Sequence, residues 1–118
     1  ARSAAVVAAL RGKLYLCGGT GAAPNVRLAA AERYHPDLNA WEALPPMIEG
    51  RSNATAVTLN GALYIIGGLG EDALQLSSVE RFNPDVGNWE RLPPMMERRE
   101  YAVATVLDGV LYVCGGFN

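Results

Sequence analysis

The chain has 118 residues, half of them hydrophobic, which is enough for one ordinary domain with a core. Its net charge of -2 gives no basic surface that would favour nucleic acid or an anionic membrane. No apolar run approaches the ~20 residues that a membrane-spanning helix needs. These properties favour a protein that binds neither nucleic acid nor membrane.

The chain opens with two apolar runs that are joined by Arg11-Gly12 and end in Gly18-Gly19. The same arrangement recurs twice, with Asn60-Gly61 and Asp108-Gly109 between the runs. Asn-Gly and Asp-Gly favour type I′ turns, because both central residues of such a turn need a positive φ. We therefore predict three β-hairpins. Their paired strands span residues 4–10 and 13–17, 53–59 and 62–66, and 101–107 and 110–114.

A variable segment follows each of the first two hairpins, at residues 20–31 and 69–79, and we predict surface loops there. Two further strands are predicted after each loop. The third shows alternating apolar and charged residues, and the fourth ends at two prolines. Because Pro cannot donate to a β-ladder, the fourth strand should be outermost. These strands lie at residues 31–34 and 41–44 in the first copy, and at 79–82 and 89–92 in the second.

The whole unit repeats with a period of about 48 residues, and four short strands per repeat match a β-propeller blade. We therefore predict an all-β protein with two complete four-stranded blades and the first two strands of a third. Together they make residues 1–118 a partial propeller. Repeat one covers residues 2–50, repeat two covers residues 51–98, and the half repeat covers residues 99–118.

The order of residues in these units resembles the Kelch repeat. The shared pattern is an Arg, a hairpin, Leu-Tyr-x-x-Gly-Gly, a loop, Val-Glu-Arg-Phe-x-Pro-Asp, a Trp and Leu-Pro-x-Met. It is most similar to the Kelch-like adaptors, in which a BTB domain precedes a propeller of about six blades. Those adaptors recruit substrates to cullin-RING ubiquitin ligases. The resemblance therefore implies a protein-protein interaction module that is part of a substrate-recognising propeller of a ligase adaptor.

Nothing in the residue pattern predicts catalysis or a cofactor. The single histidine, His35, lies in a predicted turn, and no His/Cys/Asp/Glu cluster has metal-ligand spacing. Gly18-Gly19-Thr20-Gly21 resembles a phosphate loop only superficially, since neither a Lys nor a helix follows. We predict that the chain is not an enzyme and holds no metal.

The two cysteines, Cys17 and Cys114, occupy equivalent positions of the first and third repeats. Positions separated by a whole repeat should lie beyond the ~7 Å Cα separation that a disulfide tolerates. We expect two buried thiols in a reducing compartment, and hence a cytoplasmic protein.

The loops after the second strands and the connectors before the first strands should gather on one face of a propeller. In Kelch-like adaptors the matching Arg and post-glycine positions often touch the bound peptide. Arg can hold a carboxylate in a bidentate fork, and aromatic residues are favoured anchors, so we predict a protein or peptide ligand that is acidic. The candidate partner-binding residues are Arg2, Thr20, Arg51, Asn53, Leu69, Arg99, Tyr101 and Phe117.

A structural role is the alternative for the arginines, because one begins every repeat. Separately, Glu32 and Glu80 are expected to pair with an Arg of the same or the next blade. Tyr15, Tyr64, Trp41 and Trp89 are expected to fill the wedge between neighbouring blades.

A ring of about six blades needs more repeats than this sequence holds. Three interpretations stay open: a fragment of a longer propeller, an engineered partial propeller without a ligand, or a chain whose copies share blades. For the third we expect self-association through exposed blade faces. Two other functions also stay open, an actin or cytoskeletal scaffold and a sugar-binding or sugar-converting propeller. The Tyr/His/Cys copper set of Kelch sugar oxidases is not present in the sequence.

Overall fold

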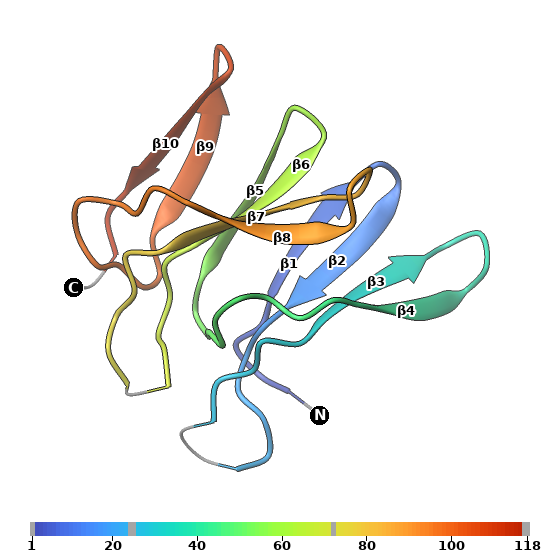
Figure 1. Ribbon diagram of the computed structural model, residues 1–118, viewed down its shortest axis with the longest axis horizontal. Coiled ribbons are helices and arrows are strands. Elements are labelled where there is room, and N and C mark those ends of the chain that lie inside the picture. Colours follow the sequence, from blue (N-terminus) through green and yellow to red (C-terminus); the bar gives the residue numbers. More distant parts are fainter. Residues whose placement is uncertain (1, 24–25, 72, 117–118) are drawn as a thin grey trace.

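The computed structural model describes residues 2–23, 26–71 and 73–116. Every regular element in these residues is a β-strand, and the paired strands are antiparallel. Blade 1 is a four-stranded sheet ordered β1-β2-β3-β4, and blade 2 is a four-stranded sheet ordered β5-β6-β7-β8 (Figure 1). A two-stranded third hairpin, β9 and β10, completes the fold. The predicted architecture is therefore confirmed, with β4 and β8 at sheet edges.

The ten strands are each five residues long. In blade 1 they are β1 Val6–Leu10, β2 Lys13–Cys17, β3 Ala31–His35 and β4 Ala40–Leu44. In blade 2 they are β5 Thr55–Leu59, β6 Ala62–Ile66, β7 Val79–Asn83 and β8 Asn88–Leu92. The third hairpin consists of β9 Val103–Leu107 and β10 Val110–Cys114.

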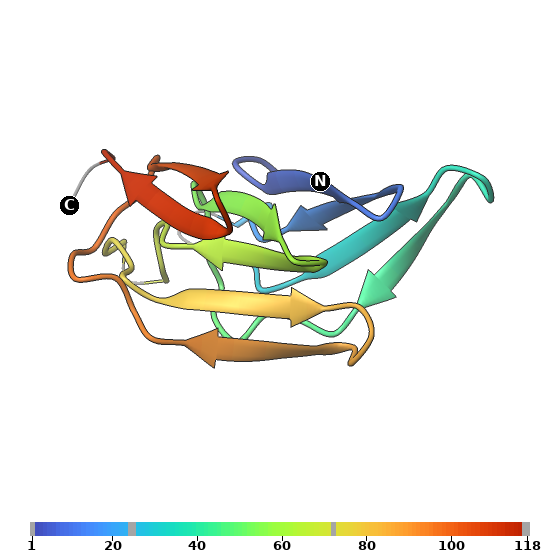
Figure 2. The same cartoon turned by 90° about the horizontal axis from the view of Figure 1, so that it is seen from above.

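The first strands of the three units, β1, β5 and β9, follow one another across the molecule (Figure 1). Their hairpin turns point to one end. The loops after β2 and β6 and the connectors leading into β1, β5 and β9 gather at the opposite end, which we call the loop face. Seen from above, β8 lies on the opposite side of the molecule from the third hairpin (Figure 2). No helix long and apolar enough to cross a membrane occurs among the described residues.

Tight two-residue turns close all three hairpins, as predicted. The φ angles are 51° at Asn60 and 75° at Gly61, and they are 52° and 75° at Asp108 and Gly109. Arg11 adopts the same conformation with φ of 52°. Positive φ at both central positions is the mark of a type I′ turn, whose twist matches that of the flanking strands.

The first strand of each unit begins two residues later than predicted. Ala4, Asn53 and Tyr101 have φ angles of 56°, 55° and 56°, which interrupt the extended chain. These residues instead link neighbouring units: the Asn53 N–H donates to the Ala4 carbonyl over 3.1 Å, and the Tyr101 N–H donates to the Asn53 carbonyl over 3.0 Å. The residues before each first strand therefore join neighbouring units on the loop face instead of extending the strands.

The hydrophobic core lies between blade 1 and blade 2. Tyr15 is 1% exposed, and its ring centroid lies 6.2 Å from that of Phe82 on the next blade. Leu63 and Ile65 are fully buried in the same cluster. Trp89 also fills the wedge as predicted, and its Nε1 donates to the Pro45 carbonyl over 2.8 Å. Trp41, in contrast, is 53% exposed on the outer side of blade 1.

Both cysteines are free, but their surroundings differ from the prediction for one of them. Cys17 is buried between the blades, whereas Cys114 on β10 is exposed. Burial raises the pKa of the Cys17 thiol to about 12, since the thiolate would lose its hydration. Because the thiolate is the reactive form, Cys17 should be inert in the folded chain.

Thiol labelling is expected to separate the two cysteines. In dilute native protein at neutral pH, iodoacetamide should add one group, at Cys114, and in denaturant it should add two. The raised pKa also means that the folded state holds the Cys17 proton above the pH at which the unfolded chain releases it. Stability should therefore fall as the pH rises above about 9. Equal native labelling of both thiols, measured by mass spectrometry, would contradict the buried position of Cys17.

Candidate functional site on the loop face

The arginine that begins each repeat anchors its own unit from within. Arg2 donates to the Gly18 and Ala30 carbonyls over 3.1 and 3.3 Å, and pairs with Glu32 at 2.9 Å. The Arg2 guanidinium thereby ties the end of β2 to β3 of the same sheet. The expected pairing of Glu32 and Glu80 with an Arg is confirmed, and the structure shows that the partners are Arg2 and Arg51 of the same blade.

Arg51 is the most buried member of this series. It is 1% exposed, and its guanidinium donates to the Gly67 and Ser78 carbonyls over 2.8 and 3.1 Å. Its Nη2 lies 2.7 Å from Oε2 of Glu80, which is itself fully buried. Glu80 also accepts the backbone N–H groups of Ile48 and Glu49, from the connector between the blades. The Arg51 guanidinium is thus enclosed and already bonded, as expected for a structural role, and its partner-binding role stays a prediction.

Arg99 occupies the same position before the third hairpin. Its Nη1 donates to the Gly115 carbonyl over 2.7 Å, matching the first contact of Arg51. Its only ion pair among the described residues is with Glu97, at 3.8 Å. The side chain is 25% exposed, so it is more accessible than that of Arg51.

The remaining predicted residues lie on the loop face, apart from Phe117, which is outside the described residues. Thr20 and Leu69 form isolated bridges with Ser3 and Ser52 at the ends of the glycine pairs. Both side chains are half-buried. Asn53 and Tyr101 lie together through their backbone hydrogen bond, and Tyr101 is 59% exposed.

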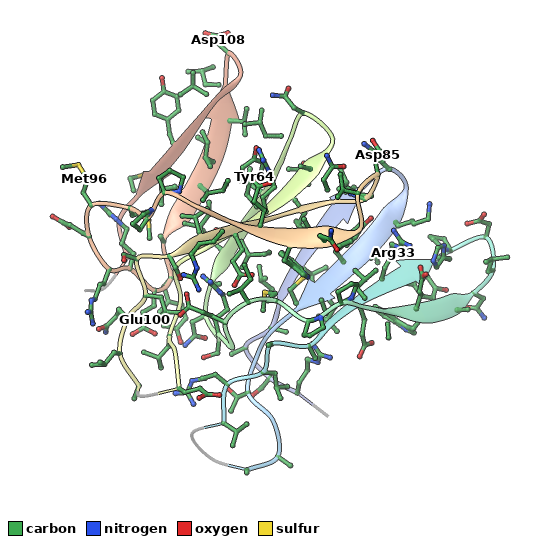
Figure 3. All side chains as sticks on the ribbon, in the orientation of Figure 1. Arg33, Tyr64, Asp85, Met96, Glu100 and Asp108 are labelled. Carbon is green, nitrogen blue, oxygen red and sulfur yellow. The ribbon has the colours of Figure 1, made fainter. Side chains whose placement is uncertain are left out.

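A polar cluster on the loop face includes two residues that the sequence analysis missed. Glu100 accepts from Asn53 Nδ2 over 3.3 Å and from Gln75 Nε2 over 3.1 Å. Figure 3 labels Glu100 at this end of the molecule and Asp108 at the opposite hairpin tip. Gln75 comes from the loop after β6 and Glu100 from the connector before β9, so the cluster joins two units. The only sequence signal for Gln75 was its place in a variable loop.

Beside this cluster lies an open groove of about 550 Å³ between the loop after β6 and the connectors on either side of blade 2. Gln75 lines the groove and also belongs to the polar cluster. The groove is amphipathic, since Ile48 and Leu74, each about half exposed, lie beside charged side chains. Its charged lining residues are Glu49, Glu71, Arg91 and Arg98.

The charged side chains near the groove differ in whether they have a hydrogen-bond or ion-pair partner. Burial acts to raise the pKa of Glu49, but hydrogen bonds with Ser78 and Arg91 outweigh it and lower that pKa. Arg91 is therefore held by an ionised partner, at 2.8 Å. In the described part of the chain, the side chains of Arg98 and Arg27 make no hydrogen bond or ion pair. Arg27 packs its backbone against Gly50, which lines the groove.

His35 ends β3 rather than lying in a turn, and its Nε2 lies 2.7 Å from Glu42. Hydrogen bonds from His35 and Arg33 lower the pKa of Glu42. No group of three or more His, Cys, Asp or Glu side chains that could hold a metal ion occurs among the described residues.

The Kelch motif profile matches residues 1–48 and 50–96, in agreement with the repeating sheets and glycine pairs. The chain belongs to the Kelch-repeat family. Its blades are of the Kelch-type β-propeller, and it has relatives among the Kelch-like proteins.

Two curated relatives illustrate this similarity. Kelch-like protein 35 of Mus musculus is 41% identical over 66 residues, covering 56% of this chain and 11% of the relative. Kelch repeat and BTB domain-containing protein 12 of Danio rerio is 34% identical over 71 residues, covering 54% of this chain and 11% of the relative. The matched part of the chain therefore covers only about a tenth of the length of these relatives.

A solved structure titled "Structure of YjhT" has a similar fold, with a TM-score of 0.77 at 18% identity. The similarity covers 87% of this chain and 40% of that one. At this identity the likeness shows the fold alone.

Proposed function

We propose that this chain is a non-enzymatic protein-interaction module whose loop face binds a protein or peptide ligand in the cytoplasm. The observation that carries the proposal is the amphipathic groove beside the Asn53–Gln75–Glu100 cluster. Its apolar side chains can cover ligand side chains, while its amide and charged groups can bind a ligand backbone. Apolar anchors beside polar and charged groups are typical of recognition surfaces.

Two guanidinium groups that have no partner in the described part of the chain favour an acidic ligand. Arg98 lines the groove and Arg27 lies next to Gly50, and neither side chain has a partner among the described residues. A carboxylate of the ligand would complete either group with charge-assisted hydrogen bonds. Arg51 contributes indirectly, because it holds the glycine pair and β7 in place below the loop.

We extend the proposal to a substrate-receptor role in a cullin-RING ubiquitin ligase. This part rests on the similarity to the Kelch-like proteins and to a Kelch repeat and BTB domain-containing protein. Co-purification of a cullin with the whole natural protein would support the role, and a cullin-free ligand complex would count against it.

Peptide binding tests the loop-face proposal directly. On an array of acidic, neutral and basic peptides of equal length, the chain should retain the acidic ones. Arg98→Ala should weaken binding about tenfold or more, because a hydrogen bond to a charged group contributes about 1.5–3 kcal/mol and about 1.4 kcal/mol is tenfold. Fluorescence anisotropy with a retained peptide measures the change.

Arg81→Ala is the matched control for this experiment. Arg81 lies on β7, pairs with Glu90 and does not line the groove, so its removal should leave peptide affinity unchanged. Circular dichroism checks that both variants stay folded. Equal retention of acidic and basic peptides, or equal affinity of the Arg98→Ala variant, would refute the assignment of the groove.

A further inference from the structure

Glu100 differs from the other shielded carboxylates of the molecule because it has no cationic partner. Four acidic side chains in the described part of the chain are buried or half-buried: Glu32, Glu49, Glu80 and Glu100. Each of the first three lies 2.9 Å or less from an Arg nitrogen. Glu100 makes no ion pair with a described residue, although shielded charges in proteins are normally paired. Its carboxylate is therefore a place on the loop face where a positive charge is missing.

Two side-chain amides fix the Glu100 carboxylate. Asn53 Nδ2 donates to its Oε2 over 3.3 Å, and Gln75 Nε2 donates to its Oε1 over 3.1 Å. Because a carboxylate only accepts, both amide nitrogens must face it, and the amide oxygens then point elsewhere. Neither amide oxygen accepts a hydrogen bond from a described residue. The cluster thus presents two carboxylate oxygens and two amide oxygens, all of which are acceptors.

A ligand in the groove reaches this cluster through Gln75, which lines the groove and also bonds Glu100. Arg98, two positions before Glu100 on the same connector, lines the groove as well. The intervening Arg99 forms a β-bridge and directs its side chain to the Gly115 carbonyl of its own unit. Residues two apart on an extended chain share a side and lie about 7 Å apart. The connector therefore presents one positive and one negative charge to the same ligand.

We propose that Glu100 and the two amide oxygens form a subsite for a basic side chain of the ligand. An ammonium or guanidinium group only donates hydrogen bonds, so it matches a site made of acceptors. Its bond to the carboxylate is charge-assisted, which makes it stronger than a bond between neutral groups. With an acidic side chain at Arg98, an extended ligand carries its base two positions from its acid. This subsite deepens the proposed binding of a peptide at the loop face and depends on it.

Two acidic peptides that differ at one position test the subsite. One carries Lys two positions from an Asp, the other carries Met in place of that Lys, and both orders of acid and base along the peptide are tried. In one order, the wild-type chain should bind the Lys peptide about tenfold or more tightly, because Lys adds hydrogen bonds between charged groups. Glu100→Gln keeps the shape of the side chain and removes its charge, so the difference between the two peptides should disappear. Fluorescence anisotropy measures the four affinities.

Asp108→Asn is the matched control, since it removes the same charge from the hairpin tip at the other end of the molecule (Figure 3). Asn60 occupies the equivalent turn position in blade 2, so the turn should tolerate the change. This variant should keep the preference for the Lys peptide, and circular dichroism checks that both variants are folded.

The outcomes separate the subsite from the function on which it depends. If acidic peptides bind but the Lys and Met peptides bind equally in both orders, the subsite is wrong and the acidic preference of the groove stands. A preference for Lys that persists in the Glu100→Gln variant, or is lost equally in the Asp108→Asn variant, also overturns the subsite. If no acidic peptide binds the wild-type chain, both the subsite and the loop-face function are wrong.

Discussion

Replacing Arg51 by Met is expected to lower the free energy of unfolding by about 3–5 kcal/mol, the range for breaking a buried ion pair by removing one partner. The substitution leaves Glu80 fully buried with no cation, and it removes the guanidinium donor from the Gly67 carbonyl and one of the two donors from the Ser78 carbonyl. Met is similar in length and apolar, so loss of volume should contribute little. Urea unfolding followed by tryptophan fluorescence measures the change.

Arg81→Met is the control that separates burial from mere pairing. Arg81 also pairs with a Glu of its own sheet, but Glu90 is 58% exposed, so the cost should be about 0–1 kcal/mol. The double variant Arg51→Met plus Glu80→Leu should recover part of the loss, since it removes the orphaned charge. Recovery should be incomplete because Ile48 and Glu49 then lose their acceptor. Equal costs for Arg51→Met and Arg81→Met would contradict the structural role.

The blade architecture was predictable because its signals are local and repeated. Asn60-Gly61 and Asp108-Gly109 specify the turn conformation directly, and the observed φ angles agree. Pro45 and Pro93 follow the edge strands β4 and β8. Each of these local patterns occurs in successive repeats. Because repeats share one structure, a pattern in one repeat supports the same prediction for the others.

The candidate site was less predictable, because it depends on contacts between units. Charged residues are usually exposed, and nothing in the sequence around Arg51 indicates that its side chain is enclosed by Gly67, Ser78 and Glu80. Gln75 and Glu100 lie in a loop and a connector 25 positions apart, so their contact follows only from the three-dimensional arrangement. A recurring charged residue in a repeat protein thus has two explanations, and only burial distinguished them here.

The first glycine of the first two pairs, Gly18 and Gly67, should tolerate no side chain, and Gly67→Ala is expected to cost about 2–5 kcal/mol. A Cβ at Gly67 would lie 2.4 Å from the Arg99 carbonyl oxygen. That oxygen cannot move freely, because it accepts the Gly68 N–H over 2.7 Å and so joins blade 2 to the next connector. The estimate combines about 1–2 kcal/mol for a left-handed alanine with about 1–3 kcal/mol for overpacking.

Gly12→Ala is the control that isolates the conformational part of this cost. Gly12 has φ of 75°, close to the 63° of Gly67, but nothing lies within 4 Å of a Cβ there. Its substitution should cost only the left-handed conformation, about 1–2 kcal/mol. The difference between the two urea midpoints therefore reports the close approach between units. If both variants lose the same stability, the glycine pair serves backbone conformation alone, and the contact with Arg99 is not what requires glycine at this position.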